Sequence, residues 1–317
     1  METLTPKSQL DLFGYDKLFN SFIALHKKNK LPNVMLLSGS KGSGKSTFTY
    51  HFINYLLSQR EEKKYSVENF KISSDNLSFK LIQNDIHPNF FLLQNDLVDE
   101  NIKIEKIRNL LKFLSKSTYL RDLKIIFIDN AEYLNLNASN ALLKSLEKPP
   151  RNTFFFIIHD DRSVIIDTIK SRCIQFKFRL NIHEKKNIFK KINKIYQLNF
   201  NEDHLDKFFY FETPGNFLRY LIALKDSSLD ISKDYLPCIL FLMEKYRIKK
   251  DSELLNFITL LIENFYNVLS LNDSNNINNY FINKNRISYL INDMKKFNLD
   301  KKNLLISIDR ILKNESQ

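Results

Sequence analysis

The eight residues GSKGSGKS, at positions 39–46, decide the fold of the first half of this chain. They fit the pattern G-x-x-x-x-G-K-[ST], in which glycines let backbone N–H groups curl around phosphate oxygens without Cβ clashes. The chain has five glycines in 317 residues, and three of them, Gly39, Gly42 and Gly44, fall within six positions. In a chain this poor in glycine, the cluster indicates a backbone requirement for a phosphate-binding turn.

The residues on either side of the loop predict a strand before it and a helix after it. NVMLLSG (33–39) is a short apolar run, and KSTFTYHFINYLLS (45–58) has apolar residues at helical spacing. That stripe consists of Phe48, Phe52, Tyr55 and Leu56. A helix that begins near Lys45 places roughly half a positive charge beside a bound phosphate.

The predicted ligand of the loop is ATP or ADP with Mg²⁺, and a tight turn without any ligand is the alternative. Lys45 is placed to reach the β- and γ-phosphates, and Ser46 to ligate Mg²⁺. Asp129, at the end of the apolar run KIIFID (124–129), is placed to hold the same ion through Ser46 or water. The predicted nucleotide-binding residues are Gly39, Ser40, Lys41, Gly42, Ser43, Gly44, Lys45, Ser46 and Thr47, and the metal ligands are Ser46 and Asp129.

Apolar runs alternate with helical patterns over the first 180 residues, which predicts a parallel sheet covered by helices. The expected strands are 33–39, 90–94, 124–129, 153–160 and 174–178. Beyond residue 180 helical patterns continue to the end, and DSNNINNYFINKN (273–285) is the expected loop. The predicted fold class is α/β and then all-α, with a P-loop domain at 1–180, a small helical lid domain at 181–227 and a helical C-terminal domain at 228–317.

Composition narrows the class of protein. The net charge of +12 is compatible with nucleic-acid contact, but the lysines are scattered along the chain, as an AT-rich coding bias also produces. The two cysteines, Cys173 and Cys238, have no metal-type spacing. No apolar run reaches the roughly 20 residues that cross a bilayer, and the N-terminus lacks a signal-peptide pattern. We therefore expect a cytoplasmic protein with no membrane partner.

The residue after Asp129 predicts weak hydrolysis. A P-loop ATPase of the AAA+ type normally has a glutamate there to polarise the attacking water, whereas this chain has Asn130. An amide cannot act as a general base. Glu132 comes two residues later, and we expect its side chain to project beyond the strand as a poor substitute. The site is thus predicted to hold nucleotide and to cleave it poorly.

The stretch KIIFIDNAEYLNLNASNALLKSLEKPPRNTFFFIIHDDRSVIIDTIKSRC (124–173) resembles the bacterial clamp-loader subunits of DNA polymerase III, which are AAA+ proteins. HPNFFLL (87–93) and TPGNFLRYL (213–221) resemble the delta-prime branch in particular. The likeness is strong over 1–180, moderate to about 225 and weak beyond, where only the ending resembles the family's collar helices. It implies that the arginine of the Ser-Arg-Cys motif, Arg172, acts in trans on nucleotide bound by a neighbouring subunit.

Three departures from the family pattern affect this interpretation. Residues 59–86 contain no cysteine, so the four-cysteine zinc module of many family members is not expected. The position of the family's first sensor residue, usually Thr or Asn, falls at His159 or Asp160. The second sensor arginine does not align, and Arg219 is the nearest candidate. Together with Asn130 these losses favour a delta-prime subunit over an active motor.

The resemblance implies a stator-type subunit of the clamp loader, a component that helps load the sliding clamp onto primed DNA. Its expected partners are the tau/gamma ATPase and delta subunits, with the clamp and DNA inside the complex. An ATP-hydrolysing tau/gamma-like motor is the alternative, and a P-loop repair or transport ATPase is a more distant one. Steady-state hydrolysis by the isolated chain distinguishes the first two.

Overall fold

The structure, a computed structural model, describes most of the chain. The described residues are 5–95, 101–116, 123–198, 200, 205–209, 212–225, 227, 229–231, 234–249, 252–297 and 301–315. Contacts divide the chain into two compact units, Met1–Asn216 and Phe217–Gln317. The predicted three-domain division at residues 180 and 227 stays a prediction.

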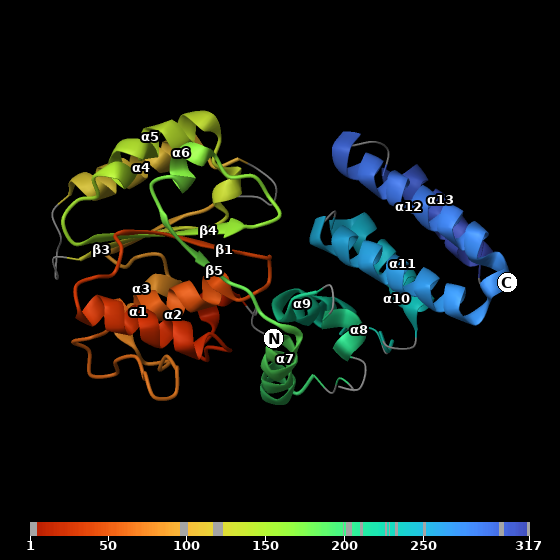
Figure 1. Cartoon of the computed structure of the whole chain (residues 1–317), viewed down its shortest axis with the longest axis horizontal. Helices are drawn as coiled ribbons and strands as arrows, with labels where there is room; N and C mark the ends of the chain where they lie inside the picture. The colour runs from red at the N-terminus through yellow and green to blue at the C-terminus, as the bar shows by residue number, and fades with distance from the viewer. Residues whose placement is uncertain are drawn as a thin grey trace. The chain divides into compact units, whose positions relative to one another are not determined.

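The first unit is built on a parallel sheet of five strands in the order β2-β3-β4-β1-β5 (Figure 1). All five predicted strands are confirmed, and so is the predicted α/β class. The strands are β1 (Val34–Gly39), β2 (Phe90–Leu93), β3 (Lys124–Ile128), β4 (Thr153–Asp160) and β5 (Ile174–Lys177). Because parallel strands end at the same edge, the carboxyl ends of β1, β3 and β4 bring their following residues together.

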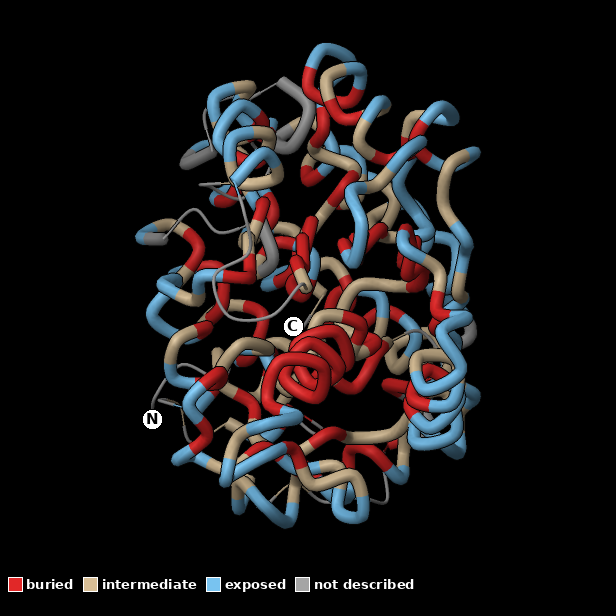
Figure 2. The backbone as a smooth tube through the Cα atoms, turned by 90° about the vertical axis from the view of Figure 1, so that its left-hand side faces the viewer, coloured by how far each residue is buried: buried red, intermediate tan, exposed pale blue. Residues whose placement is uncertain are grey.

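Helices cover both faces of this sheet (Figure 1). One layer contains α1 (Asp16–Lys27), α2 (Lys45–Leu57) and α3 (Leu77–Gln83). The other contains α4 (Ile104–Ser115), α5 (Leu136–Glu147) and α6 (Asp167–Lys170). Successive strand residues point to opposite faces, so Leu37 packs with the first layer and Leu36 with the second. Figure 2 shows the buried backbone enclosed by exposed helices and loops.

Phenylalanine rings fix the position of α2, the helix that follows the P-loop. Phe19 of α1 makes edge contacts with Phe48 and Phe52, with 5.5 Å between ring centroids in each pair. Such pairs contribute about 0.5–1.5 kcal/mol beyond the area that they bury. All three side chains are fully buried, which holds the start of α2 rigidly beneath the loop.

Three helices follow the sheet: α7 (Ile182–Tyr196), α8 (Leu205–Phe209) and α9 (Pro214–Leu224). A capping box starts α7, in which the Asn181 side chain accepts from the N–H of Glu184, and the Glu184 carboxylate accepts from the N–H of Asn181. Ile188, Phe189 and Ile192 form the buried side of this helix, whereas Ile195 is half exposed.

The second unit is helical, with α10 (Tyr235–Lys249), α11 (Ser252–Asn272), α12 (Ile277–Phe297) and α13 (Lys301–Asn314). The predicted loop at 273–285 is wrong. It is reduced to the cap residue Asp273 and a 3₁₀ turn, Ser274–Asn276, after which α12 begins. The asparagines that suggested a loop disfavour a helix only weakly, and burial of Tyr280, Ile287 and Ile291 outweighs that preference.

One helix of the second unit, the part of α11 from Leu254 to Asn272, is long and apolar enough to cross a membrane by length and composition alone. About 44% of that window is buried inside the protein. Its buried residues, among them Phe257 and Leu261, lie in a helix that contacts α10 and α12. Packing as the central helix of this unit accounts for its apolar composition.

Candidate nucleotide-binding site

The P-loop joins β1 to α2 and requires glycine at two positions. Gly42 and Gly44 have φ values of +77° and +95°, in the left-handed region that L side chains rarely adopt. A Cβ atom at Gly42 would lie 2.3 Å from Thr213 Oγ1. The left-handed backbone expected for a phosphate-binding loop is therefore present, and a side chain at Gly42 would collide with Thr213 and Asn216.

Lys45, the first residue of α2, is buried at the base of the loop. Its ammonium group donates to the carbonyl oxygens of Gly39 (2.5 Å) and Ser40 (2.9 Å). Burial lowers the pKa of Lys45, and nearby carboxylates, chiefly those of Asp160 and Glu132, oppose that shift. These carbonyl contacts hold the cation beside the cradle, within the loop that it is predicted to serve.

Ser46 and Asp129 meet as the sequence predicts, since the Ser46 hydroxyl donates to Asp129 Oδ1 at 3.4 Å. Burial raises the pKa of Asp129 to about 6, with a further contribution from the Glu132 carboxylate, and the charge of Lys45 opposes both. A hydroxyl and a carboxylate beside a glycine cradle are the oxygen ligands that Mg²⁺ prefers. The residues therefore fit a magnesium–nucleotide ligand, which the Ser46 hydroxyl and the Asp129 carboxylate would help to hold.

Glu132 lies closer to this cluster than the sequence suggests. Asn130 has a left-handed φ of +59° and turns the chain into the short 3₁₀ helix Ala131–Tyr133. That turn returns the Glu132 carboxylate to the sheet edge, where it accepts from the N–H of Asp160 at 3.4 Å. The expectation that Glu132 projects away from the strand ends is corrected by this geometry.

The end of β4 carries the two candidate sensor residues. The His159 ring is buried and donates an N–H to the carbonyl of Ser163 at 2.9 Å. Asp160 accepts from the guanidinium of Arg162 at 3.3 Å. Burial alone would raise the pKa of Asp160, but the bonds and charge of Arg162 outweigh burial and lower it. Asp160 is thus an ionised carboxylate near Lys45, and the His159 ring is hydrogen-bonded to the loop that follows β4.

The start of α9 lies directly against the P-loop, a contact that the sequence did not reveal. The Thr213 hydroxyl donates to the carbonyl of Lys41 at 2.8 Å, and the Gly215 N–H donates to the carbonyl of Gly42 at 3.0 Å. A Cβ atom at Gly215 would lie 2.6 Å from the Gly42 carbonyl oxygen. The sequence feature that could have indicated this contact is Gly215, an isolated glycine in the motif TPGN (213–216) of a glycine-poor chain. Arg219 belongs to the second unit, and its sensor role stays a prediction.

Arg172 lies away from this cluster, on the turn between α6 and β5. Ile174, at the start of β5, pairs with Met35, four residues before Gly39 on β1. Four strand residues span about 13 Å at 3.3 Å per residue. The arginine therefore lies near the amino edge of the sheet, while the P-loop lies at the carboxyl edge.

No group of three or more His, Cys, Asp or Glu side chains able to hold a metal occurs in the described part of the chain. The stretch from which cysteines are missing, 59–86, is organised by hydrogen bonds. The Asn76 amide accepts from Asn54 at 2.8 Å and caps α3, and the Glu61 carboxylate accepts from the N–H groups of Leu77 and Ser78. Side-chain amides and carboxylates thus fix the backbone there.

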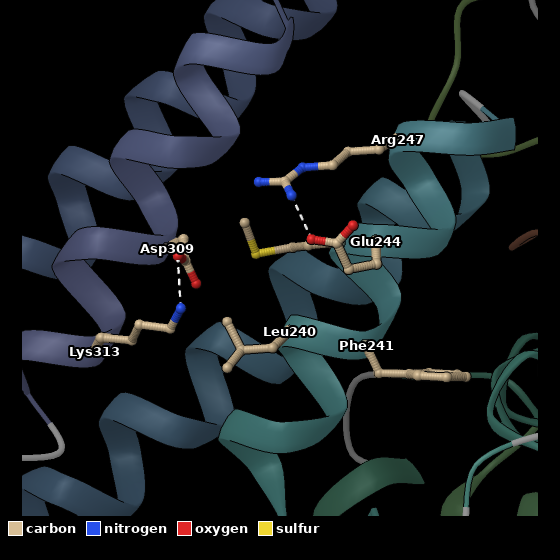
Figure 3. Close-up of a pocket in the computed structure, with 7 residues that line it drawn as sticks. Leu240, Phe241, Glu244, Arg247, Asp309 and Lys313 are labelled. Atoms are coloured by element: carbon tan, nitrogen blue, oxygen red, sulfur yellow. Dashed lines mark hydrogen bonds and ion pairs between the residues drawn. The ribbon is translucent and has the colours of Figure 1, made fainter.

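A separate hollow lies in the second unit between α10 and α13 (Figure 3). Two ion pairs face it, Glu244 with Arg247 on α10 and Asp309 with Lys313 (2.9 Å) on α13. Each pair is formed within one helix and neutralises itself. The hollow is lined by Leu240, Phe241, Met243, Glu244, Arg247, Asp309 and Lys313. It offers no net charge for an ionic ligand.

The family model described as "DNA polymerase III, delta subunit" matches residues 14–181, which contain the whole sheet and the P-loop. The chain belongs to this family. Together with curated delta-prime relatives, this match confirms the resemblance to delta-prime clamp-loader subunits that the sequence predicts.

Curated relatives agree with this family. DNA polymerase III subunit delta′ of Pseudomonas aeruginosa is 34% identical over 143 residues, which cover 45% of this chain and 42% of that protein. The gamma subunit of Buchnera aphidicola from Acyrthosiphon pisum is 28% identical over 267 residues, covering 78% and 70%. The chain matches about half the length of its delta-prime relatives.

Among solved structures, a gamma subunit-related protein of DNA polymerase III from Thermotoga maritima is similar to this chain. Its TM-score is 0.50 at 17% identity, and the match covers 93% of this chain and 99% of that one. At this identity the likeness concerns the fold, in which a P-loop sheet domain is followed by helices.

Proposed function

We propose that this chain is a delta-prime-like, stator-type subunit of the DNA polymerase III clamp loader. It would help load the sliding clamp onto primed DNA in the cytoplasm, in a complex with tau/gamma-type ATPase and delta subunits. In that complex its own P-loop would bind ATP or ADP with Mg²⁺ and hydrolyse it poorly, while Arg172 would serve the site of the neighbouring ATPase.

One observation supports this proposal above all. The residues predicted to bind phosphate and magnesium are complete, but an amide occupies the position where hydrolysis needs a carboxylate. Lys45, Ser46 and Asp129 converge at the carboxyl edge of the sheet, but the residue that follows Asp129 is Asn130. Since an amide cannot accept the proton of an attacking water, binding is supported and cleavage is not.

The position of Arg172 supports a role in trans. The arginine lies toward the opposite edge of the sheet from its own P-loop, so it is poorly placed to contact nucleotide bound there. A guanidinium supplied to a neighbouring site stabilises the charge that develops on the transferred phosphoryl group, and such fingers are worth about 10³–10⁵ in rate in other systems.

Nucleotide binding is tested by thermal unfolding with millimolar ATP and Mg²⁺. A ligand that binds the folded chain raises the unfolding free energy by RT ln(1 + [L]/Kd), about 2.7 kcal/mol at 100 times Kd. We expect this gain in the native chain and its loss in Lys45→Ala. An unchanged melting temperature in the native chain would show that the loop is a structural turn.

Arg172 is tested in the reconstituted complex. Arg172→Ala removes no core atom, so the variant should assemble normally, and ATP turnover by the complex should fall by at least about 10³-fold at the site that it serves. Turnover equal to that of the native complex would refute the trans assignment.

An ATP-hydrolysing, tau/gamma-like motor is the second candidate, and the position of Glu132 favours it. Its carboxylate lies at the same sheet edge as Asp129 and Lys45, where it could accept a proton from water. Steady-state hydrolysis by the isolated chain decides between the two. Turnover that disappears in both Lys45→Ala and Glu132→Gln would establish the motor, whereas the stator predicts little turnover in the native chain.

A further inference from the structure

Arg172 is engaged by its own subunit. One of its terminal nitrogens, Nη1, donates to the carbonyl of Thr168 at 2.8 Å and lies 3.4 Å from Ser171 Oγ. The other, Nη2, lies 3.8 Å from the carboxylate of Glu147, the last residue of α5. The Nε atom is buried and has no partner among the described residues. The side chain is 31% exposed.

These contacts partly occupy the recognition edges of the guanidinium. A guanidinium binds phosphate through two parallel N–H groups, either the terminal pair or Nε with one terminal nitrogen. In Arg172 the Thr168 carbonyl occupies Nη1, burial shields Nε, and Glu147 lies beside Nη2. To present a full edge to a neighbour, the side chain must rotate away from Thr168 and Glu147.

The local sequence explains this conformation. α6 is a single helical turn whose C-terminal carbonyls need donors, and Arg172 follows it closely enough for its side chain to reach the Thr168 carbonyl. Glu147 stands at the end of the neighbouring helix, and α5 contacts α6. Of the two anchors, the carbonyl belongs to the backbone, so Glu147 is the one that substitution can remove.

We propose that Glu147 is a positioning residue that holds Arg172 in a withdrawn conformation and so limits its delivery to the neighbouring subunit's triphosphate. This inference rests on the proposed trans role of Arg172 and concerns the regulation of that role. The neighbour's phosphate competes with Glu147 for the same guanidinium. A ligand that binds the extended conformation better than the withdrawn one shifts the population toward extension.

The expected effect is modest because Glu147 is 61% exposed. Ion pairs of this kind change an equilibrium by roughly 1.4- to 5-fold. If the withdrawn conformation dominates, loss of Glu147 raises the extended fraction, and therefore kcat, by the same factor. KM for ATP should stay unchanged, because the arginine acts on the transition state.

The test uses full-length chain reconstituted with its ATPase and delta partners. Glu147→Gln should raise kcat for ATP by about 1.4- to 5-fold at low salt, and the difference from the native complex should shrink as salt screens the pair. Glu105→Gln is the matched control, since it removes an exposed carboxylate from the adjacent helix α4 and should leave kcat unchanged. An unchanged or lowered kcat in Glu147→Gln would overturn the inference.

The Arg172→Ala background separates this inference from the proposed function. Glu147→Gln should have no effect there, because the two residues act as one unit. If Arg172→Ala itself leaves turnover unchanged, the trans role fails. If Arg172→Ala lowers turnover and Glu147→Gln does not raise it, the trans role stands and the withdrawn conformation has no regulatory effect. A Glu147→Gln effect that persists without Arg172 also overturns the inference.

Discussion

Replacement of Asp129 by asparagine should make the protein more stable and less able to bind magnesium–nucleotide. The carboxyl is half-buried in the folded chain, and desolvation raises its pKa to about 6, against 3.8 ordinarily. The folded chain therefore holds this proton more tightly than the unfolded chain, so the contribution of Asp129 to stability falls as pH rises from about 4 through 6. A difference of roughly two pKa units corresponds to about 3 kcal/mol.

The magnitude depends on pH in a defined way. The substituted amide would carry no charge at any pH, so Asp129→Asn should exceed the native unfolding free energy by about 3 kcal/mol at pH 8 and by about half as much at pH 5. Urea unfolding followed by far-UV circular dichroism measures both, since the chain lacks tryptophan.

Asp161→Asn is the control, because it neutralises an exposed carboxylate in the same region and should change stability little. The stability that ATP and Mg²⁺ add should also disappear in Asp129→Asn. A variant no more stable than the native chain at pH 8, or a gain independent of pH, would refute the burial argument.

Three further substitutions test the site and the fold. Gly42 has φ +77°, and an added Cβ would lie 2.3 Å from Thr213 Oγ1. Gly42→Ala should therefore cost about 1–3 kcal/mol of unfolding free energy and abolish nucleotide binding. Gly14→Ala, at φ +78°, is the control and should reduce stability without affecting nucleotide binding. Burial lowers the pKa of His51 to about 3, below the unfolded value of 6.5, so the contribution of His51 to stability is present above pH 6.5 and lost in acid. Between pH 7.5 and 5 the native chain should lose about 2 kcal/mol of unfolding free energy that His51→Gln does not lose. Urea unfolding at several pH values measures this difference. Ile287→Ala in α12 should cost about 2–5 kcal/mol by the same assay, and Ile282→Ala, at 60% exposure, should change little.

The sequence determined the sheet, the P-loop and the family because these features are local. A strand such as 153–160 is an unbroken apolar run, and Gly42 and Gly44 mark a backbone that other residues cannot adopt without strain. The pairing of Ser46 with Asp129 was also predictable, since parallel strands deliver their carboxyl ends to one edge. The prediction of a loop at 273–285 failed because the asparagine-rich composition hid the buried stripe of α12.

Only the tertiary structure decided what surrounds those motifs. It returned Glu132 to the sheet edge, set Thr213 and Gly215 against the P-loop, and engaged Arg172 with Thr168 and Glu147. The residues from 213 to 215 lie more than 170 positions from the loop that they contact. A left-handed turn such as that at Asn130 redirects the chain within one or two residues. Periodicity and spacing record which residues share a face of one element, whereas contacts between elements depend on packing that no local pattern encodes.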